Sequence, residues 1–277
     1  MIKQYLEIKN QYPDSILFYR MGDFYEMFFD DAKLASEILE ITLTSRDKNK
    51  ENSIPLCGVP FHAASAYIQK LVDRGYKVAI CEQMEEAAKG KRIVRREVIR
   101  VITPGMVLED ELLQPKANNY LMSIAQGDEK IGMAFLDAST GDFGAAEVNT
   151  WQSLLDEARR IGPKEILLPE SVKGQAPIRQ LMKAYPNVLY SSLPNGVFTH
   201  GPLLEDFNLD LSYLNDKKDA YRAVKAILFY VQETQKVKPA HLSEPDFYQV
   251  SDYMILDETT RRNLELFENW QTHFSGR

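Results

Sequence analysis

The sequence is poor in the residues that build disulfide scaffolds and metal sites. It has two cysteines, Cys57 and Cys81, and four histidines, and none of them lies in a CxxC motif or at metal-ligand spacing. We therefore expect no metal site and two reduced thiols in the core of an intracellular protein. A nucleophilic pair of Cys57 and His62, on either side of "GVPF", has no third residue to orient it, and we do not favour it.

Long apolar runs and nucleotide-binding loops are also missing. No segment approaches the ~18 consecutive apolar residues that a membrane helix needs. The N-terminal "MIKQYLEIKNQ" is polar and amphipathic, unlike a secretory signal. These absences predict a cytoplasmic protein with no membrane contact. Because no GxxxxGK[ST] motif occurs, we expect no bound nucleotide or other cofactor and no enzymatic activity in this chain.

The composition is that of a globular protein, with 277 residues, 44% hydrophobic and 26% charged. This length suggests two domains. The formal net charge of −7 argues against a basic nucleic-acid-binding protein taken as a whole. Residues 89–100, "KGKRIVRREVIR", nevertheless hold six basic residues against one acidic residue, a local surplus of 6 − 1 = +5. Such a run is either a solvated loop or an edge that contacts phosphates.

Helices and strands alternate in the first part of the chain, which predicts a mixed-sheet α/β domain over residues 1–115. Apolar residues at helical spacing predict helices over 2–12, 28–40 and 62–75, the last closed by Gly75. Alternating apolar residues predict strands at 15–21, 41–46, 76–83 and 97–105. The acidic and Pro/Asn-containing residues that follow are typical of a linker, and residues 116–127 hold its end and the start of the next unit.

The second unit, residues 120–250, is predicted to be a ribonuclease-H-like α/β domain. Three strands with tight turns at 127–128 and 140–142 are followed by a helix at 151–162, a strand at 165–169 and a long amphipathic helix at 217–236. The pattern between 172 and 214 is weak. Residues 251–277 are expected to begin a third, helical domain with a helix from about Thr259.

Acidic residues near the first hairpin of the second unit raise an alternative function. Asp137, Asp142 and Glu147 lie on or beside this hairpin, and ribonuclease-H-like folds can host metal-dependent nucleases. Two-metal chemistry needs several carboxylates that converge on ions about 3.5–4 Å apart. Because Asp142 lies in a predicted turn and Glu147 ends a strand, we favour turn and surface roles for these acids.

The segment "RMGDFYEMFF", residues 20–29, places four aromatic residues around two acids, as in either a charged piece of core or a surface wedge. It belongs to a set of stretches that resemble the MutS family of DNA mismatch-repair proteins. These stretches are "ILFYRMGDFYEMFFDDA" (16–32), "ITLTSRD" (41–47), "IPLCGVPFHAASAYIQKLV" (54–72), "GYKVAICEQ" (75–83), "REVIRVITPG" (96–105), "LDASTGDF" (136–143), "YVQETQ" (230–235) and "ILDETTRRNLEL" (255–266).

The resemblance implies a role for each residue of the family's Phe-x-Glu motif, here residues 24–26. Phe24 enters the minor groove at a mispair and stacks on a base, and Glu26 forms a hydrogen bond to that base; Met21 packs beside the wedge. Tyr25, Phe28 and Phe29 are expected to be core residues. The resemblance also suggests that Arg46 and Arg100 contact the DNA backbone, with Arg96 as a further candidate. His62 and Ser65 are candidates as well, because they open a predicted helix, and a helix start can bind phosphate.

The resemblance further implies partners and limits. The chain looks like an N-terminal fragment that holds the mismatch-binding and connector domains, with duplex DNA containing mispairs or small loops as its ligand and MutL as a partner of the connector. Full-length members of the family are homodimers that bind ATP and Mg²⁺, whereas we expect this chain to be a monomer that binds DNA weakly. A nuclease that uses Asp137 and Glu147, or a protein-interaction module built on residues 20–29, remain as alternatives.

Overall fold

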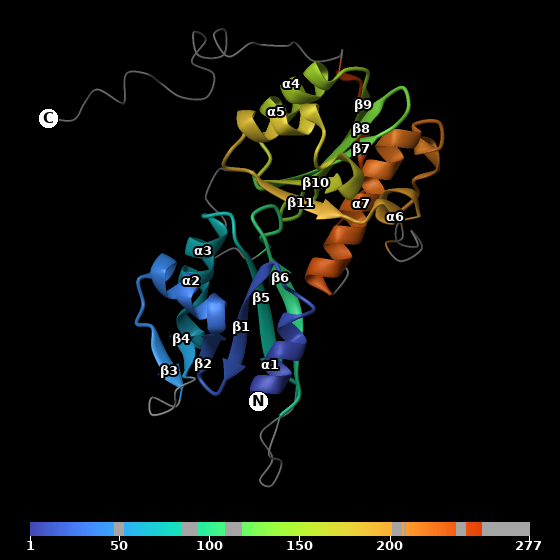
Figure 1. Ribbon diagram of the computed structural model, residues 1–277. Coiled ribbons are helices and arrows are strands. Elements are labelled where there is room, and N and C mark those ends of the chain that lie inside the picture. The colour runs from blue at the N-terminus through green and yellow to red at the C-terminus, as the bar shows by residue number, and fades with distance from the viewer. Residues whose placement is uncertain are drawn as a thin grey trace, which may run out of the picture.

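The computed structural model describes residues 1–46, 53–84, 94–108, 118–200, 207, 209–236 and 242–250. They form two α/β units, each built on a six-stranded sheet (Figure 1). The predicted fold class, a mixed-sheet α/β unit followed by a ribonuclease-H-like unit, is confirmed. The helix expected from about Thr259 lies outside the described residues, as do residues 109–117 of the expected linker.

The first sheet has the strand order β3-β4-β2-β1-β5-β6, in which only β1 and β5 pair in parallel. Its strands are β1 (Ser15–Met21), β2 (Phe24–Phe28), β3 (Thr44–Arg46), β4 (Ile54–Pro60), β5 (Lys77–Gln83) and β6 (Arg96–Ile102). Its helices are α1 (Ile2–Lys9), α2 (Phe29–Leu39), the short η1 (Phe61–Ala63) and α3 (Ala64–Val72). The sheet is therefore mixed and has α-helices on both faces.

Two hydrophobic clusters cover the two faces of this sheet. Leu17 and Tyr19 of β1 pack with Tyr5 of α1 on one face, which we call the α1 face. Ile16 and Phe18, the alternate residues of β1, pack with α2 and α3 on the opposite face. Because side chains of a strand alternate between faces, this burial of both sets explains the nearly continuous apolar run in "SILFYRM".

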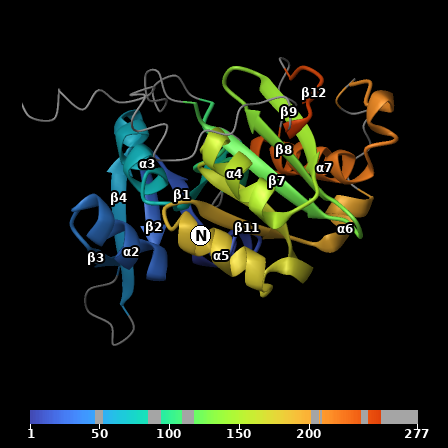
Figure 2. The same cartoon turned by 90° about the horizontal axis from the view of Figure 1, so that it is seen from above.

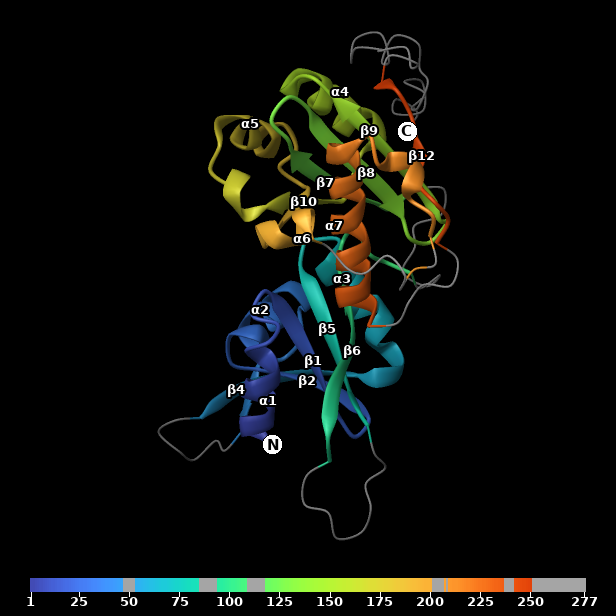
Figure 3. The same ribbon diagram turned by 90° about the vertical axis from the view of Figure 1, so that its right-hand side faces the viewer.

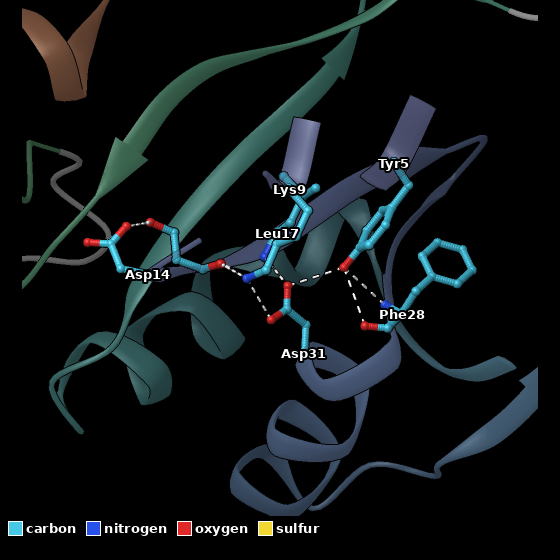
Figure 4. Close-up of polar contacts among 7 residues, drawn as sticks. Tyr5, Lys9, Asp14, Leu17, Phe28 and Asp31 are labelled. Carbon is cyan, nitrogen blue, oxygen red and sulfur yellow. Dashed lines mark hydrogen bonds and ion pairs between the residues drawn. The ribbon is translucent and has the colours of Figure 1, made fainter. Parts of the chain in front are cut away.

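A buried carboxylate attaches α1 to the sheet (Figure 4). Asp31, in the first turn of α2, accepts hydrogen bonds from Lys9 Nζ at 2.9 Å and from the backbone N–H of Leu17 at 3.0 Å. The hydroxyl of Tyr5 donates to the same carboxylate at 3.2 Å. Burial and the nearby Asp31 charge raise the pKa of Tyr5, so the phenol remains a donor at neutral pH. One acid thus holds two helices and a strand together.

The second sheet has the order β11-β10-β7-β8-β9-β12, in which β8 runs antiparallel to both neighbours. Its strands are β7 (Tyr120–Gln126), β8 (Ile131–Asp137), β9 (Asp142–Val148), β10 (Glu165–Pro169), β11 (Leu189–Leu193) and β12 (Asp246–Phe247). The helices are α4 (Trp151–Ile161), η3 (Glu170–Val172), α5 (Ala176–Ala184), α6 (Asn195–Thr199), η5 (Ser212–Leu214) and α7 (Lys218–Gln235). Figure 2 shows α4 and α5 on one side of this sheet and α7 on the other.

The two units meet where β6 leads toward the second sheet and α7 lies against β6 (Figure 3). Glu165, fully buried at the start of β10, accepts hydrogen bonds from the Thr103 hydroxyl and from the backbone N–H of Gly105. Its other oxygen accepts from Ser191 Oγ at 2.5 Å and Tyr230 Oη at 2.6 Å. A single carboxylate therefore joins the end of the first unit to three elements of the second.

Candidate nucleic-acid interface

The segment with the Phe-x-Glu motif forms the β1–β2 hairpin. Met21 pairs with Phe24 across a two-residue turn, Gly22–Asp23, and Gly22 has a φ of +60°. Glycine is favoured at the first central position of such a hairpin turn because a Cβ there is strained. The hairpin lies in the interior of the sheet, with β4 bonded to β2 and β5 bonded to β1. Both strands that carry the turn are therefore fixed on their outer sides.

The aromatic residues of the hairpin divide sharply between core and surface. Phe24 is 48% exposed, whereas Tyr25 and Phe28 are buried, as expected for core residues. Phe29 is partly buried and packs against the α1 cluster. The exposed and buried residues of "FYEMF" thus follow one another as in a strand, and the ring of Phe24 lies in solvent at the end of that strand. A surface wedge at Phe24 requires this exposure.

Cross-strand register places the three residues expected at a mispair on one face of the sheet. Phe24 is opposite both Met21 and Pro60, and Glu26 is opposite Gly58. Directly opposed residues share a face, so Met21, Phe24 and Glu26 all lie on the α1 face. A Cβ at Gly58 would lie 3.6 Å from Cγ of Glu26 and 3.2 Å from the carbonyl oxygen of Tyr25. Because Gly58 has no side chain, no side-chain atoms of β4 cover Glu26 at this position.

A polar chain fixes the opposite face of the hairpin. The Tyr25 hydroxyl donates to the Glu82 carboxylate, and the Arg20 guanidinium forms an ion pair with Glu82 at 3.9 Å. Arg20 Nε also donates to the carbonyl oxygen of Gly22 in the turn. Burial, followed by the hydrogen bond to Glu82, raises the pKa of Tyr25, which keeps the phenol protonated. On the face opposite the α1 face, side chains of β1, β2 and β5 therefore hold the turn in place.

Arg96 was expected to contact the DNA backbone, and its position in the structure does not fit that role. The residue is only 9% exposed, and its Nε donates to the carbonyl oxygen of Arg20 at 2.7 Å. The guanidinium also donates to the carbonyl oxygen of Val94 and lies 4.9 Å from the ring centroid of Tyr19. These partners already use its donors, so we reassign Arg96 to the support of the hairpin.

Arg96 and Arg100 are on opposite faces, although they are four residues apart in one strand. Arg96 pairs with Gln83, and Arg100 pairs with Ile80, but the register shifts between these pairs at Cys81, which is opposite Val98. At this irregularity the register passes from Val98 to Arg100 and skips Ile99, which reverses the alternation of side chains. Arg100 therefore shares the face of Ile80, toward α2 and α3. A count of residues in the sequence cannot reveal this reversal.

The other expected backbone contacts are spread around the hairpin. His62 is exposed in η1, directly after Phe61, and Ser65 is half-buried in the first turn of α3. The α3 N-terminus has no side-chain cap. Arg46 ends β3 opposite Ile54, six residues along β4 from Pro60, and therefore about 20 Å from the wedge. The side chain of Arg46 lies outside the described part of the structure.

Two residues near the tip were missing from the predicted site. Phe61 is 46% exposed and its N–H donates to the carbonyl oxygen of Asp23 in the turn at 2.9 Å. Arg20 places its guanidinium carbon 3.6 Å from the centroid of the Phe61 ring. In the sequence, the only sign of Phe61 is that an aromatic residue follows Pro60, which ends β4. This sign points to the wedge only when β4 is known to pair with β2.

Among the residues described, the carboxylates of the second unit do not come together as a metal site, so nothing in the structure supports the nuclease alternative. Asp137 is buried and accepts from the backbone N–H groups of Asn119 and Ser139. Glu147 is opposite Gly132, five residues along β8 from Asp137, so the two acids lie about 17 Å apart. Two-metal catalysis needs ions about 3.5–4 Å apart. Glu147 instead accepts from the first N–H groups of α7.

The two cysteines are structural in this arrangement. Both are buried, and burial raises the pKa of the Cys57 and Cys81 thiols to about 12. Thiols with such pKa values stay protonated and unreactive at neutral pH. Within the residues described, no three Cys, His, Asp or Glu side chains come together as a metal site. None of the helices described there is long and apolar enough to cross a bilayer.

Comparison with known proteins identifies what the two units are similar to. Residues 1–111 match the family described as MutS domain I, and residues 119–244 match the family described as MutS domain II. The DNA mismatch repair protein MutS of Desulforapulum autotrophicum is 46% identical over 284 residues, which covers 98% of this chain and 32% of that protein. The protein of the same name from Pelotomaculum thermopropionicum is 47% identical over 276 residues, covering 96% of this chain and 32% of that protein. This chain thus spans about a third of the length of the curated relatives it matches.

Proposed function

This chain belongs to the MutS family of DNA mismatch repair proteins, and from that premise we propose that it recognises mispaired or unpaired bases in duplex DNA through the β1–β2 hairpin. Residues 1–115 are the mismatch-binding domain in this proposal, residues 120–250 the connector, and residues 251–277 the start of a third domain. The observation that carries the proposal is the exposed ring of Phe24 at the tip of a hairpin fixed on both sides.

The physical basis of recognition is the cost of opening a base step. An aromatic ring that stacks on a base gains about 1–3 kcal/mol whatever the base is. Insertion of the ring unstacks and kinks the duplex, at a cost of a few kcal/mol. A mispair is already poorly stacked and flexible, so this cost is lower there than in matched DNA. Phe24 therefore selects DNA by its deformability and does not read base edges.

Glu26 adds a polar filter on the same face as Phe24. In its protonated form, the carboxyl group donates a hydrogen bond to a base nitrogen that is exposed at a mispair. In its ionised form, the carboxylate is repelled by phosphates and finds few minor-groove donors in matched duplex, chiefly the guanine amino group. Both forms disfavour ordinary duplex. Met21, opposite Phe24 in the hairpin, packs beside the inserted ring.

Phosphate contacts in this proposal come from groups around the wedge. His62 in η1 and Ser65 in the first turn of α3 follow closely after Phe61, the residue bonded to the hairpin turn. The N-terminal end of a helix attracts phosphate because its dipole is positive there. Arg46 and Arg100 extend the contacts to more distant parts of the duplex. Arg96 has no direct contact and supports the hairpin.

The remaining family properties are proposals for a longer protein that contains these units. We propose that the connector meets MutL, that the longer protein acts as a homodimer, and that its ATP and Mg²⁺ chemistry lies outside these 277 residues. The chain itself acts by binding, without catalysis. With a net charge of −7, it neutralises few phosphates, so we expect weak binding that falls steeply with salt.

The test compares binding to a G·T duplex and to the matched duplex by fluorescence anisotropy at low salt. Phe24→Ala is expected to bring the affinity for the G·T duplex down to that for matched DNA, with an unchanged circular dichroism spectrum. Leu43→Ala is the matched control, because Leu43 is 46% exposed in the same domain but precedes β3, away from the wedge. Retention of G·T preference by folded Phe24→Ala protein would refute the proposal.

A further inference from the structure

A second exposed aromatic ring lies beside Phe24. Phe61 is 46% exposed, nearly the same fraction as Phe24, and it follows Pro60, the residue opposite Phe24 in the sheet. Its backbone N–H donates to the carbonyl oxygen of Asp23, the second residue of the hairpin turn. The two phenylalanines therefore belong to one hydrogen-bonded unit at the same end of the sheet, although they are 37 positions apart (61 − 24).

The two rings are on opposite sides of the hairpin. Phe24 is on the α1 face with Met21. Phe61 contacts the other face, where the Arg20 guanidinium lies 3.6 Å from its ring centroid and the Tyr25 ring meets it edge to face at 6.5 Å. Alternation along β1 and β2 places Arg20 and Tyr25 on this face. The Gly22–Asp23 turn is thus flanked by one exposed ring on each side.

Two charged side chains, Arg20 and Glu82, hold the Phe61 ring in its position on the sheet. Arg20 is held by the Glu82 carboxylate and by the Gly22 carbonyl oxygen, and its planar guanidinium stacks on the ring. A cation over an aromatic face is attracted to the ring's negative electrostatic potential. The ring is therefore held in place while nearly half of its residue surface stays in solvent. The exposed part of the ring is therefore presented to a partner in a fixed position beside the hairpin turn.

We propose that Phe61 is a second DNA-contacting ring, which packs against deoxyribose on a strand that borders the minor groove entered by Phe24. This inference rests on the proposed function, because the hydrogen bond from Phe61 to the turn beside Phe24 places its ring next to the duplex proposed there. The deoxyribose edge is the apolar part of the DNA backbone, and a phenyl ring has no hydrogen-bonding group with which to read bases or hold phosphates. Phe61 thus stabilises the inserted state and limits rotation of the wedge.

The proposal separates the roles of the two rings. Since deoxyribose is the same at every step, Phe61→Ala is expected to weaken binding to each mispaired duplex by a similar factor, about fivefold to tenfold. The ranking of mispairs is expected to stay unchanged. Phe61→Leu, which keeps an apolar side chain over Arg20, is expected to show an intermediate loss. Phe24→Ala instead removes the preference for mispaired DNA.

The deciding experiment is photo-crosslinking of the 277-residue chain to a G·T duplex at low salt. Benzoylphenylalanine is placed singly at position 24, 61 or 43; position 43 is matched in exposure to Phe61. We expect crosslinks to DNA from positions 24 and 61 only, and a purely structural Phe61 would give none. Crosslinking from 24 without 61, or from 43 as strongly as from 61, would overturn this inference and leave the proposed function intact. Absence of crosslinks from position 24 would overturn both.

Discussion

Replacement of Glu165 by alanine tests how the two units are joined. The carboxylate is fully buried and accepts hydrogen bonds from the Thr103 hydroxyl, the Gly105 N–H, the Ser191 hydroxyl and the Tyr230 hydroxyl. Alanine leaves these four donors without an acceptor and opens a cavity. Burial, the largest cause of the raised pKa of Tyr230, persists in the variant, so this phenol cannot relieve the loss by ionising.

The magnitude follows from the four donors. An unsatisfied buried donor costs about 1–3 kcal/mol. The three hydroxyl groups can rotate to other acceptors, whereas the Gly105 N–H is fixed by the backbone, so the low end applies to most of them. The sum is about 4 kcal/mol, which corresponds to a fall in Tm of roughly 10 °C for a protein of this size. Glu165→Gln keeps the shape and one acceptor oxygen, and is expected to cost about half as much.

The assay is thermal and urea unfolding followed by circular dichroism, with Glu170→Ala as the control. Glu170 follows the same strand but is exposed, so its replacement is expected to change the free energy of unfolding by less than about 0.5 kcal/mol. If Glu165→Ala unfolds within about 2 °C of the parent chain, the four contacts do not stabilise the junction and the reasoning fails.

Three further predictions concern other parts of the chain. Asp31→Ala removes the acceptor shared by Lys9 and Tyr5, and urea unfolding is expected to show a loss of about 3 kcal/mol. Gly105→Ala places a Cβ 2.8 Å from that of Glu165, so a lower Tm corresponding to about 1–3 kcal/mol is expected. The raised pKa of Tyr25 means that its unfolded form loses a proton near pH 10 while the folded form keeps it. This contribution to stability is therefore complete below about pH 10 and is lost progressively as the pH rises above that value toward the folded-state pKa, so the urea midpoint is expected to stay level up to about pH 10 and to fall steadily above it.

The elements predicted correctly are those with strong and local patterns. The buried strand β1 and the amphipathic helices α2 and α7 follow from apolar spacing alone. Strands β2 and β4 were not predicted, since β2 has only five residues and β4 contains two prolines, which usually disfavour a strand assignment. The weak pattern after residue 172 concealed α5 and β11 for a similar reason, because both are short.

The residues of the candidate site also differ in whether a local pattern in the sequence could identify them. Phe24 and Glu26 could be proposed from a motif, because their spacing is local. The buried position of Arg96 depends on its contact with the Arg20 carbonyl oxygen, 76 residues away in the sequence. The importance of Phe61 depends on the pairing of β4 with β2. Long-range pairing decides which basic and aromatic residues reach the surface, and a single sequence carries little information about it.

The interior position of the β1–β2 hairpin has a mechanical consequence for how DNA is sensed. A hairpin bonded along both outer edges has low compliance, whereas a duplex bends at its weakest step. When the two press against each other, nearly all of the deformation falls on the DNA, and little ordering entropy is lost by the protein. The order of affinities among mispaired duplexes is then expected to follow the bending stiffness of each duplex, because the shape of the protein is the same in every complex.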